Sequence, residues 1–424
     1  MKLNFKTYGN PLWKNETIES VHIELTDKCN SGCPMCPRYI DQGAQLNPLL
    51  PNAEITLEQF KNWLPVEFIQ GLSRFYACGN YGDPIAAKDT LAIYQYIRSI
   101  NPNTGLAMHT NGGVRNPEWW YELGKTMNIS ARGDYCTFSI DGLEDTNHLY
   151  RRKTNFKRIM ENVREFLRAG GVAHWDFIVF DYNEHQVEEA RSLAKEMGFE
   201  NFNIKRTTRW YTYNEGRGAY EVKNRKGEVE YTLRQPLNEE LKHSTWSVLQ
   251  ENLQAPNYVT EQEYDKMTYD ELTYNMENPN GAPEKVNYSK FEIGCRAAKG
   301  PRASKNEIFV SATGHLFPCC FLGGEPWRHI HGTELSKDNF MKMVELNGGM
   351  DSIDLHKHSL ADIMASPIYS ELLARSFNVG HPMRSRQCAT CCGVGWNKLD
   401  FGELGSKNSS YFDEEKNSGS LRES

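Results

Sequence analysis

The segment Cys29-Asn-Ser-Gly-Cys33-Pro-Met-Cys36 decides the fold prediction for this chain. It follows Val21-His-Ile-Glu-Leu25, whose alternation is typical of a half-buried strand, so the cysteines fall on the loop at the strand's C-terminal end. Three thiolates at this spacing can hold three irons of a cubane and leave the fourth iron open. A closed structural metal site needs four protein ligands, whereas a reactive site keeps one position free. The spacing therefore predicts a metal centre that accepts a further ligand, on the kind of loop where barrel enzymes place active sites.

The simplest alternative is a zinc knuckle that takes its fourth ligand from His22, Cys78 or elsewhere. The downstream sequence favours a cofactor site instead, because further strand-like runs end in Gly-, Asn- and Asp-containing stretches: Phe75-Tyr-Ala-Cys-Gly-Asn-Tyr-Gly-Asp-Pro84, Met108-His-Thr-Asn-Gly-Gly113, and Phe138-Ser-Ile-Asp-Gly142 followed by Asn147-His-Leu-Tyr-Arg151. In this order the segments resemble the radical S-adenosylmethionine (SAM) superfamily, whose signature is Cys-x3-Cys-x2-Cys after the first barrel strand.

The resemblance implies a set of cofactor-binding residues. Cys29, Cys33 and Cys36 would hold a [4Fe-4S] cluster, and SAM would bind its open iron. Glycines allow close backbone approach, an acid can accept from the SAM ammonium, and a forked guanidinium suits the SAM carboxylate. The expected SAM contacts are Gly79, Asn80, Gly82, Asp83, Ser139, Asp141 and Arg151. Two positions depart from the family pattern, since Met35 replaces a common aromatic residue and Asp83 replaces the usual glutamate.

The N-terminal half alternates strand-like and helix-like runs. Helix starts are visible at Thr56-Leu-Glu-Gln59, a capping box, and at Asn116-Pro-Glu118, a cap followed by proline. Six strand-helix units imply parallel strands with helices outside, which an open doubly wound sheet would satisfy equally well. The resemblance implies an α/β fold with a partial, TIM-like (β/α)6 barrel. Its strands are expected at 21–25, 74–78, 105–109, 136–140, 175–180 and 202–205.

The composition divides the chain further. We expect the barrel domain over residues 1–210 and a bridging insertion over 211–290, where Asn, Glu, Tyr and Lys dominate and apolar periodicity fades. An auxiliary domain is expected over 291–400. The tail at 401–424 is polar and is expected to be disordered, because it has too little apolar content to fold by itself.

A second cysteine set lies in the predicted auxiliary domain. The run 308–317 reads as a hairpin with its turn at 312–314, which would bring Cys319 near Cys295. With the late Cys388-Ala-Thr-Cys391 pair, this arrangement resembles the auxiliary-cluster domain called SPASM, or its shorter relative twitch. The resemblance assigns Cys295, Cys319, Cys388 and Cys391 to a second [4Fe-4S] cluster, with Cys320 and Cys392 either substituting as ligands or packing as small hydrophobes. A structural zinc ribbon is the alternative.

Charge and hydropathy exclude other classes. The net charge is -7 with interspersed signs, which gives no basic footprint for nucleic acid. No apolar run approaches the about 18 residues of a membrane helix, and the N-terminus lacks the apolar core of a signal peptide. The eleven cysteines cluster at metal-like spacings rather than as a disulfide framework. We therefore expect a cytoplasmic protein with no membrane and no nucleic-acid partner.

The implied function is that of a radical SAM enzyme. Such an enzyme cleaves SAM reductively to a 5'-deoxyadenosyl radical, which abstracts a hydrogen atom from the substrate. No catalytic residue is assigned beyond the cluster and SAM site. The resemblance to auxiliary-cluster domains favours a peptide or protein substrate, with oxidation or epimerisation of a small metabolite such as a sugar as the alternative. A reductant such as flavodoxin or ferredoxin is expected as a partner. The interpretation from another class is a non-catalytic Fe-S or zinc protein that binds or passes electrons.

Overall fold

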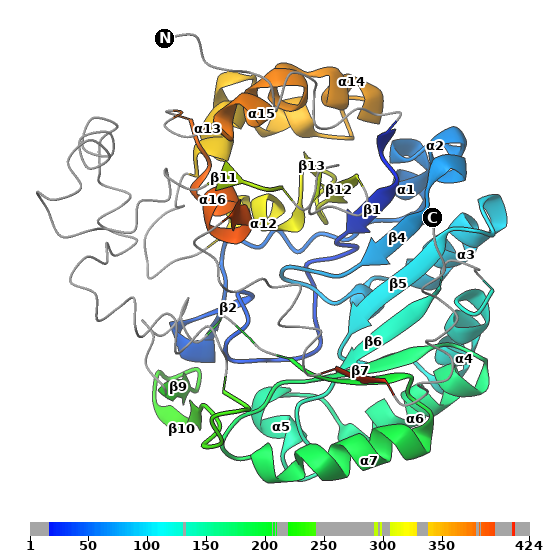
Figure 1. Cartoon of the computed structure of the whole chain (residues 1–424), viewed down its shortest axis with the longest axis vertical. Coiled ribbons are helices and arrows are strands. Elements are labelled where there is room, and N and C mark those ends of the chain that lie inside the picture. Colours follow the sequence, from blue (N-terminus) through cyan, green and yellow to red (C-terminus); the bar gives the residue numbers. More distant parts are fainter. Residues whose placement is uncertain are drawn as a thin grey trace, which may run out of the picture. The chain divides into compact units, whose positions relative to one another are not determined.

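The computed structural model describes residues 17–129, 133–205, 207, 209, 219–242, 292–295, 297–298, 306–328, 338–378, 381, 383–394 and 409–411. The chain forms two compact units, each assembled from separate stretches of sequence (Figure 1). The first unit comprises Met1–Glu24, Leu49–Tyr76 and Gln250–Lys398, and the second comprises Leu25–Pro48, Ala77–Leu249 and Leu399–Ser424. The units interleave along the chain, whereas the sequence-based boundaries divide it into consecutive blocks.

The first unit contains a short run of strands in the order β13-β12-β1-β4. β1 (Ser20–Ile23) is fully buried and pairs in parallel with β12 (Glu307–Val310), with Val21 opposite Ile308. The hairpin predicted at 308–317 is confirmed, because β13 (Leu316–Phe317) pairs antiparallel with β12 and the turn contains Gly314 at φ 80°. β4 is Arg74–Ala77, and the helices that precede it are α1 (Leu57–Trp63) and α2 (Val66–Gly71).

The second unit contains parallel strands in the order predicted from the alternating rhythm, namely β5 (Gly105–Thr110), β6 (Tyr135–Ser139), β7 (Ala173–Phe177) and β8 (Asn201–Ile204). Helices connect them: α3 (Thr90–Ile100), α4 (Pro117–Thr126), α5 (Asn147–Tyr150), α6 (Phe156–Arg168) and α7 (Val187–Met197). This is a mixed α/β fold with a parallel sheet, as the sequence predicts, and it is consistent with a partial barrel.

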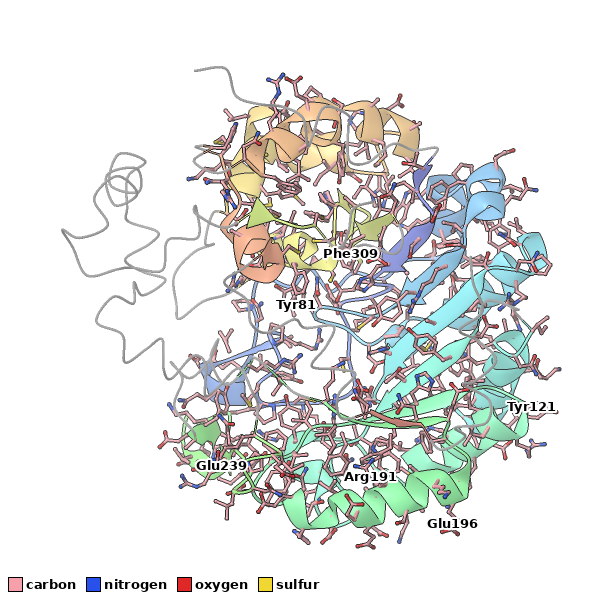
Figure 2. The ribbon with its side chains drawn as sticks, in the orientation of Figure 1. Tyr81, Tyr121, Arg191, Glu196, Glu239 and Phe309 are labelled. Carbon is pink, nitrogen blue, oxygen red and sulfur yellow. The ribbon has the colours of Figure 1, made fainter. Side chains whose placement is uncertain are left out.

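Aromatic packing fixes the helix-facing side of this sheet. Trp120 of α4 lies 5.3 Å from the ring of Phe138 on β6, and Phe166 of α6 lies 5.8 Å from it. Because side chains alternate along a strand, the opposite side of the same strands carries polar groups such as Asp176 and Asn203. Figure 2 shows Glu196 on the outer side of α7, away from the sheet. Polar side chains near the ends of the parallel strands thus lie on the face of the sheet opposite the helices.

Local signals in the sequence account for the helix boundaries. Thr56 and Gln59 form the predicted capping box, with 2.9 Å between the Thr56 backbone nitrogen and Gln59 Oε1. Asn116 caps α4 by accepting a hydrogen bond from the backbone nitrogen of Trp119. Gly198 ends α7 at φ 89°, a left-handed conformation that favours glycine.

Two segments differ from the sequence-based expectation. Within the predicted insertion, β9 (Ala219–Lys223) and β10 (Val229–Arg234) form an antiparallel hairpin, because Tyr220, Val222 and Leu233 alternate to one apolar side. In the tail predicted to be disordered, β15 (Ser409–Tyr411) pairs antiparallel with β8. The remaining residues of the insertion from 243 to 290, and the rest of the tail, lie outside the described residues.

The C-terminal part of the first unit is mainly helical. Its elements are β11 (Glu292–Ile293), α12 (Cys320–Gly323), α13 (Asn339–Leu346), α14 (Leu360–Ala365), α15 (Leu373–Ser376), α16 (Arg386–Cys392) and β14 (Gly393–Val394). β11 pairs antiparallel with β14, which places Ile293 opposite Gly393. In the second unit, β2 (Tyr39–Ile40) and β3 (Gln45–Leu46) form a small ribbon directly after the first cysteine segment.

Candidate functional site

The loop that carries Cys29, Cys33 and Cys36 is held by backbone hydrogen bonds. The backbone nitrogen of Cys36 donates to the carbonyl of Cys33 at 3.1 Å, so the second half of the loop is a tight turn. The backbone nitrogen of Gly32 donates at 2.8 Å to the carbonyl of Arg152, which follows α5. Tyr39 closes the loop by donating its hydroxyl to the Ser31 carbonyl at 3.2 Å. The three thiols are therefore presented by a backbone that is fixed at both ends.

Polar groups surround two of these sulfurs. The Ser31 backbone nitrogen lies 3.4 Å from Cys29 Sγ, and the Ser31 hydroxyl lies 3.1 Å from Cys33 Sγ. Asn111 Nδ2 reaches Cys29 Sγ at 3.6 Å, and Arg151 Nη1 reaches Cys33 Sγ at 3.7 Å. N–H and O–H groups that face sulfur stabilise thiolate character and tune a bound metal. The surroundings fit thiolate ligands better than buried structural cysteines.

Burial sets the charge state of the free thiols. Desolvation, with smaller contributions from Asp83 and the other two cysteines, raises the pKa of Cys29 well above its usual value. Desolvation also raises the pKa of Cys36, although the positive charge of Arg209 opposes it. Three thiolates so close together and so buried need a bound cation to become stable. The donor set therefore fits an iron-sulfur cluster, with Cys29, Cys33 and Cys36 as its ligands.

Asp83 is buried beneath the cysteine loop and is saturated with hydrogen bonds. One carboxylate oxygen accepts from Thr110 Oγ1 at 2.7 Å and from the backbone nitrogen of Ile85 at 3.2 Å. The other accepts from Asn111, at 2.8 Å from the backbone nitrogen and 2.6 Å from Nδ2. Burial raises the pKa of Asp83, and these hydrogen bonds lower it in part. The expected contact of Asp83 with SAM stays a prediction; in the structure the carboxylate positions Asn111, which in turn contacts Cys29.

Asp141 and Arg151 form a buried ion pair beside Cys33. Arg151 Nε donates to Asp141 Oδ2 at 2.5 Å, and the second carboxylate oxygen of Asp141 accepts from the backbone nitrogen of Ile178 at 2.6 Å. Burial raises the pKa of Asp141, opposed by Arg151. Although burial disfavours its charge, the adjacent Asp141 carboxylate raises the pKa of Arg151. Arg151 is therefore a fixed cation that reaches a cysteine sulfur, and its expected role toward the SAM carboxylate stays a prediction.

Gly82, in the glycine-containing stretch after β4, has a packing role in the structure, and its expected contact with SAM stays a prediction. A Cβ added to Gly82 would lie 1.7 Å from the carbonyl oxygen of Thr26, so this glycine permits close approach of two backbone segments of the protein. Gly79 and Asn80 lie on the same stretch and are partly exposed, as is Ser139 at the end of β6. Their expected contacts with SAM stay predictions.

Sequence reasoning missed Asn111 and Ser31. Asn111 lies in the quoted stretch after β5 but received no role, and it contacts Cys29, Asp83 and Asn30. Ser31 lies between two cysteines of the motif and contacts both. The sequence shows that both residues can form hydrogen bonds. It does not show that Asn111 contacts Cys29, because the two are 82 residues apart.

The hairpin β9–β10 covers the cysteine loop with apolar side chains. Tyr220, Val222 and Leu233 join Cys33, Met35, Tyr150, Ile178 and Phe180 in one buried cluster. The hydroxyl of Tyr220 donates to the Pro34 carbonyl at 3.1 Å, and that of Tyr231 donates to the Leu149 carbonyl at 2.6 Å. Met35, which replaces an aromatic residue of the family pattern, is therefore a core residue of this cluster.

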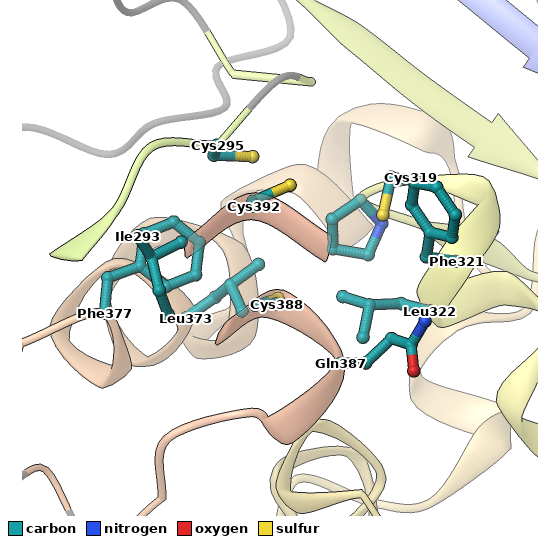
Figure 3. Close-up of a pocket in the computed structure, with 11 residues that line it drawn as sticks. Ile293, Cys295, Cys319, Phe321, Leu322, Leu373, Phe377, Gln387, Cys388 and Cys392 are labelled. Carbon is teal, nitrogen blue, oxygen red and sulfur yellow. The ribbon is translucent and has the colours of Figure 1, made fainter. Parts of the chain in front are cut away.

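In the first unit, four cysteines line one apolar pocket of about 330 Å3, a volume that includes space open to solvent (Figure 3). Cys295 follows β11, and Cys319 precedes α12 directly after the hairpin, as the sequence predicts. Cys388 and Cys392 are four residues apart on α16 and thus share a helix face. Burial raises the pKa of Cys295 to about 12 and raises that of Cys319 and Cys388. These thiols also need a bound cation to ionise.

The sequence assigned Cys391 rather than Cys392 to this set. Cys391 belongs to α16, but its side chain lies outside the described residues. Cys392 is held at the pocket by the strand pairing, since the Gly294 backbone nitrogen donates to the Cys392 carbonyl at 2.9 Å. Cys320, which the sequence offered as an alternative ligand, is not among the residues that line the pocket.

The alternative zinc ligands also have defined surroundings. His22 packs in the first unit against Tyr76 and Phe309, with ring centroids 4.7 and 4.9 Å away; Phe309 is labelled in Figure 2. Among the described residues, no three His, Cys, Asp or Glu side chains form a ready single-ion site. In an iron-sulfur cubane each thiolate binds a different iron, so its ligands need not surround one ion.

Comparison with known proteins gives one family match. The family model described as the radical SAM superfamily matches residues 23–194, a segment that contains Cys29, Cys33, Cys36, Asp83 and Arg151 and ends before Cys295. No curated protein matches the chain.

Several solved structures are similar to the chain at low identity. One is Streptococcus suis SuiB bound to S-adenosylmethionine, at 12% identity over 86% of this chain and 69% of that chain, with a TM-score of 0.45. A second is anSMEcpe with bound AdoMet, at 13% identity over 83% of this chain and 78% of that chain, also with a TM-score of 0.45. A third is BtrN in complex with AdoMet and 2-DOIA, at 9% identity over 88% and 92%, with a TM-score of 0.39.

Within the part of the chain that the structure describes, no helix is long and apolar enough to span a lipid bilayer. The family match covers the cysteine loop, the parallel strands β5 to β7 and the helices between them. Proteins of the matched superfamily are enzymes that use a [4Fe-4S] cluster and SAM. The segment of this chain that carries the cysteine loop is therefore similar to the radical SAM superfamily.

Proposed function

We propose that this chain is a radical SAM enzyme that cleaves SAM reductively and abstracts hydrogen from a peptide or protein substrate. The observation that carries the proposal is the fixed loop of Cys29, Cys33 and Cys36 inside the matched domain, with N–H and O–H groups directed at its sulfurs. When bound, a reduced [4Fe-4S] cluster supplies the electron that cleaves SAM to methionine and a 5'-deoxyadenosyl radical.

The chain's own residues bind, orient and exclude water. Cys29, Cys33 and Cys36 would hold the cluster, and Asp83 would keep Asn111 aimed at Cys29. Arg151 supplies a buried positive charge beside Cys33 that suits a carboxylate, and its pairing with Asp141 fixes the direction of the guanidinium. The hairpin β9–β10 keeps solvent from the loop. Gly79, Asn80, Gly82 and Ser139 complete the SAM-binding set that the family resemblance implies.

The C-terminal cysteines are proposed to hold a second [4Fe-4S] cluster. Cys295, Cys319 and Cys388 supply three ligands, and α16 offers both Cys391 and Cys392 for the fourth, because positions three and four residues beyond Cys388 lie on its face of a helix. A zinc ribbon would need four thiolates around one ion, each at about 2.3 Å, and among the described residues no three ligand side chains are arranged in that way. This supports iron over a zinc ribbon.

The peptide substrate rests on the resemblance of this cysteine pattern to SPASM and twitch domains. The second candidate is oxidation or epimerisation of a small metabolite such as a sugar, in which the same cluster would accept an electron from the substrate. A non-catalytic Fe-S or zinc protein would not cleave SAM, which separates it from both.

The test begins with anaerobic reconstitution. We expect about eight irons and eight sulfides per chain, about half of them lost when Cys29, Cys33 and Cys36 are all changed to Ala. The dithionite-reduced protein should form 5'-deoxyadenosine from SAM, and the triple variant should not. Stoichiometric zinc with little iron, or no 5'-deoxyadenosine from the iron-loaded protein, would overturn the proposal.

The fourth auxiliary ligand needs matched variants. Cys391→Ala and Cys392→Ala change adjacent residues of one helix, so they differ chiefly in which thiol is lost. We expect Cys392→Ala to lower the iron content to that of one cluster and Cys391→Ala to leave it near two. The reverse pattern would return the assignment to Cys391.

A further inference from the structure

The most basic stretch of this acidic chain adjoins the cysteine loop. Five of the eight residues Arg151-Arg-Lys-Thr-Asn-Phe-Lys-Arg158 are cationic and none is acidic, although the chain as a whole carries a net charge of -7. Arg151 points inward to Asp141, with 15% of its side chain exposed. The other four, Arg152, Lys153, Lys157 and Arg158, are named the basic ridge below. It is a local reversal of the overall charge.

The ridge is at the surface. Lys153 and Arg158 are exposed, and 71% of the Lys157 side chain is exposed. Two carboxylates neutralise part of it, Glu144 at 2.9 Å from Lys157 and Glu230 at 2.8 Å from Arg152. Such exposed pairs are weak and exchange readily with other partners. An acidic surface can therefore compete for the same cations.

The ridge touches the cysteine loop through its backbone. The Arg152 carbonyl accepts from the Gly32 backbone nitrogen at 2.8 Å and from the Ser31 hydroxyl at 3.3 Å. A Cβ added to Gly32 would lie 3.5 Å from Cε of Lys153, so the lysine stem runs along the loop between Cys29 and Cys33. Its Nζ lies 5.9 Å from the ring centroid of Tyr39. The ridge thus hydrogen-bonds directly to Ser31 and Gly32, which lie between Cys29 and Cys33 in the sequence.

The helix dipole and the backbone conformation do not favour cations at these positions, although Arg152 and Lys157 form ion pairs and Arg158 donates to the Arg115 carbonyl at 3.0 Å. Lys157 and Arg158 lie in the first turn of α6, and that turn contains no acidic residue. The positive end of the helix dipole there favours acids and disfavours cations. Lys153 has φ 65°, a left-handed conformation that is uncommon for residues other than glycine, asparagine and aspartate. Residues that oppose the local backbone or helix preference, as these cations do, are typical of functional surfaces.

We propose that the basic ridge is the docking surface for an acidic one-electron donor protein of the flavodoxin class. The inference rests on the proposed function, because the electron for SAM cleavage must enter from outside. In the transfer, a flavin hydroquinone loses one electron and becomes the semiquinone, and the cluster held by Cys29, Cys33 and Cys36 gains that electron. An acidic donor is repelled by the chain's net charge, so it needs a local positive surface to orient it.

The position of the ridge favours a reductant over an acidic peptide substrate. The hairpin β9–β10 covers the loop around Cys33 and Met35 with apolar side chains. The ridge borders the same loop at Ser31 and Gly32, which both donate to the Arg152 carbonyl and lie between Cys29 and Cys33 in the sequence. Electron transfer needs a short path to the cluster rather than access to the SAM side, and this edge provides one.

The test uses a charge-reversed variant, Lys153→Glu with Lys157→Glu. The control is Lys195→Glu with Lys61→Glu, which changes the net charge equally at two exposed lysines in the last turns of α7 and α1. Binding of oxidised flavodoxin to each protein is measured by calorimetry at low and high salt, and this readout does not depend on activity. We expect about tenfold weaker binding for the ridge variant only, with the difference shrinking as salt rises.

The second readout compares two reductants. With dithionite, a small chemical reductant, the ridge variant should form 5'-deoxyadenosine at the wild-type rate. With reduced flavodoxin, it should be slower by about the loss in binding. Lys153→Asn keeps a residue that tolerates the left-handed conformation and should show part of the same loss, which separates charge from backbone strain.

The outcomes separate the inference from the proposed function. Unchanged flavodoxin binding and flavodoxin-driven rate in the ridge variant would overturn the docking surface while leaving SAM cleavage by dithionite intact. An equal loss with both reductants and unchanged binding would overturn it too, because the ridge would then support the loop. Loss of an acidic peptide's binding with unchanged flavodoxin binding would assign the ridge to substrate instead. Absence of SAM cleavage by the dithionite-reduced wild type is the failure of the proposed function.

Discussion

Replacing Asp83 with alanine should destabilise the second unit even in the metal-free protein. The carboxylate accepts hydrogen bonds from Thr110 Oγ1, from two nitrogens of Asn111 and from the Ile85 backbone. Thr110 and Asn111 are each 3% exposed, so water cannot easily replace the lost acceptor. Each buried donor left without an acceptor costs about 1–3 kcal/mol.

The expected loss is smaller than the sum of the lost hydrogen bonds. The Thr110 hydroxyl can rotate, and removing a buried carboxylate, whose pKa burial has raised, relieves a desolvation cost. With two Asn111 nitrogens stranded, we expect the free energy of unfolding to fall by about 2–5 kcal/mol for Asp83→Ala. Asp83→Asn retains one acceptor oxygen and should lose about 1–3 kcal/mol.

The assay is urea unfolding of metal-free, reduced protein, followed by circular dichroism. Glu196→Ala is the control, since Glu196 is exposed on α7, and it should change the unfolding free energy by less than about 0.5 kcal/mol. A second readout is SAM affinity after reconstitution, which should weaken because Asn111 no longer holds its position beside Cys29. If Asp83→Ala unfolds like Glu196→Ala, the carboxylate does not organise this site and the reasoning fails.

Two further predictions concern the same unit. Gly82→Ala places a methyl group against the Thr26 carbonyl oxygen, 1.7 Å from the ideal Cβ position, and should prevent stable folding of the loop, measured as loss of iron uptake and a lower Tm; uptake at the wild-type level would contradict it. Burial would raise the pKa of Asp176, but Lys205 at 3.0 Å and neighbouring donors lower that pKa overall. The ion pair therefore stabilises the fold above the ordinary aspartate pKa of 3.8, and this stabilisation is lost as the pH falls through the lowered value. Because 46% of the Lys205 side chain is exposed, Lys205→Met should cost only about 1–3 kcal/mol at pH 7. The cost should be smaller below pH 3.8, where the carboxyl becomes protonated, and urea unfolding that shows the same deficit on both sides of pH 3.8 would refute the linkage.

The parallel strands and their helices were predictable because local signals agree with the packing. β8 was expected at 202–205 and lies at Asn201–Ile204. The capping residues Thr56 and Asn116 act as the sequence indicates. The sequence could not distinguish a barrel from an open sheet, because both place parallel strands under helices.

The parts that could not be predicted depend on contacts between distant segments. β12 pairs with β1 across nearly the whole chain, with Glu307 opposite Ser20, and no local pattern contains that pairing. The hairpin β9–β10 was hidden because its apolar side has only Tyr220, Val222 and Leu233, amid a polar composition. The cysteine motif identified its own ligands, but the partners that hold them, Asn111 and Asp83, required the strand ends to be brought together.

Three departures from local preference lie in the second unit, at residue 83 and within residues 153–158. Asp83 is a buried acid, Lys153 has a left-handed backbone, and the first turn of α6 carries cations where acids are favoured. Two of them contact the cysteine loop or its direct neighbours: Asp83 through Asn111, and Lys153 through Gly32. A fold tolerates such costs where another requirement sets the residue. Holding the proposed cluster would account for Asp83, and docking of the proposed acidic electron donor would account for the exposed cations.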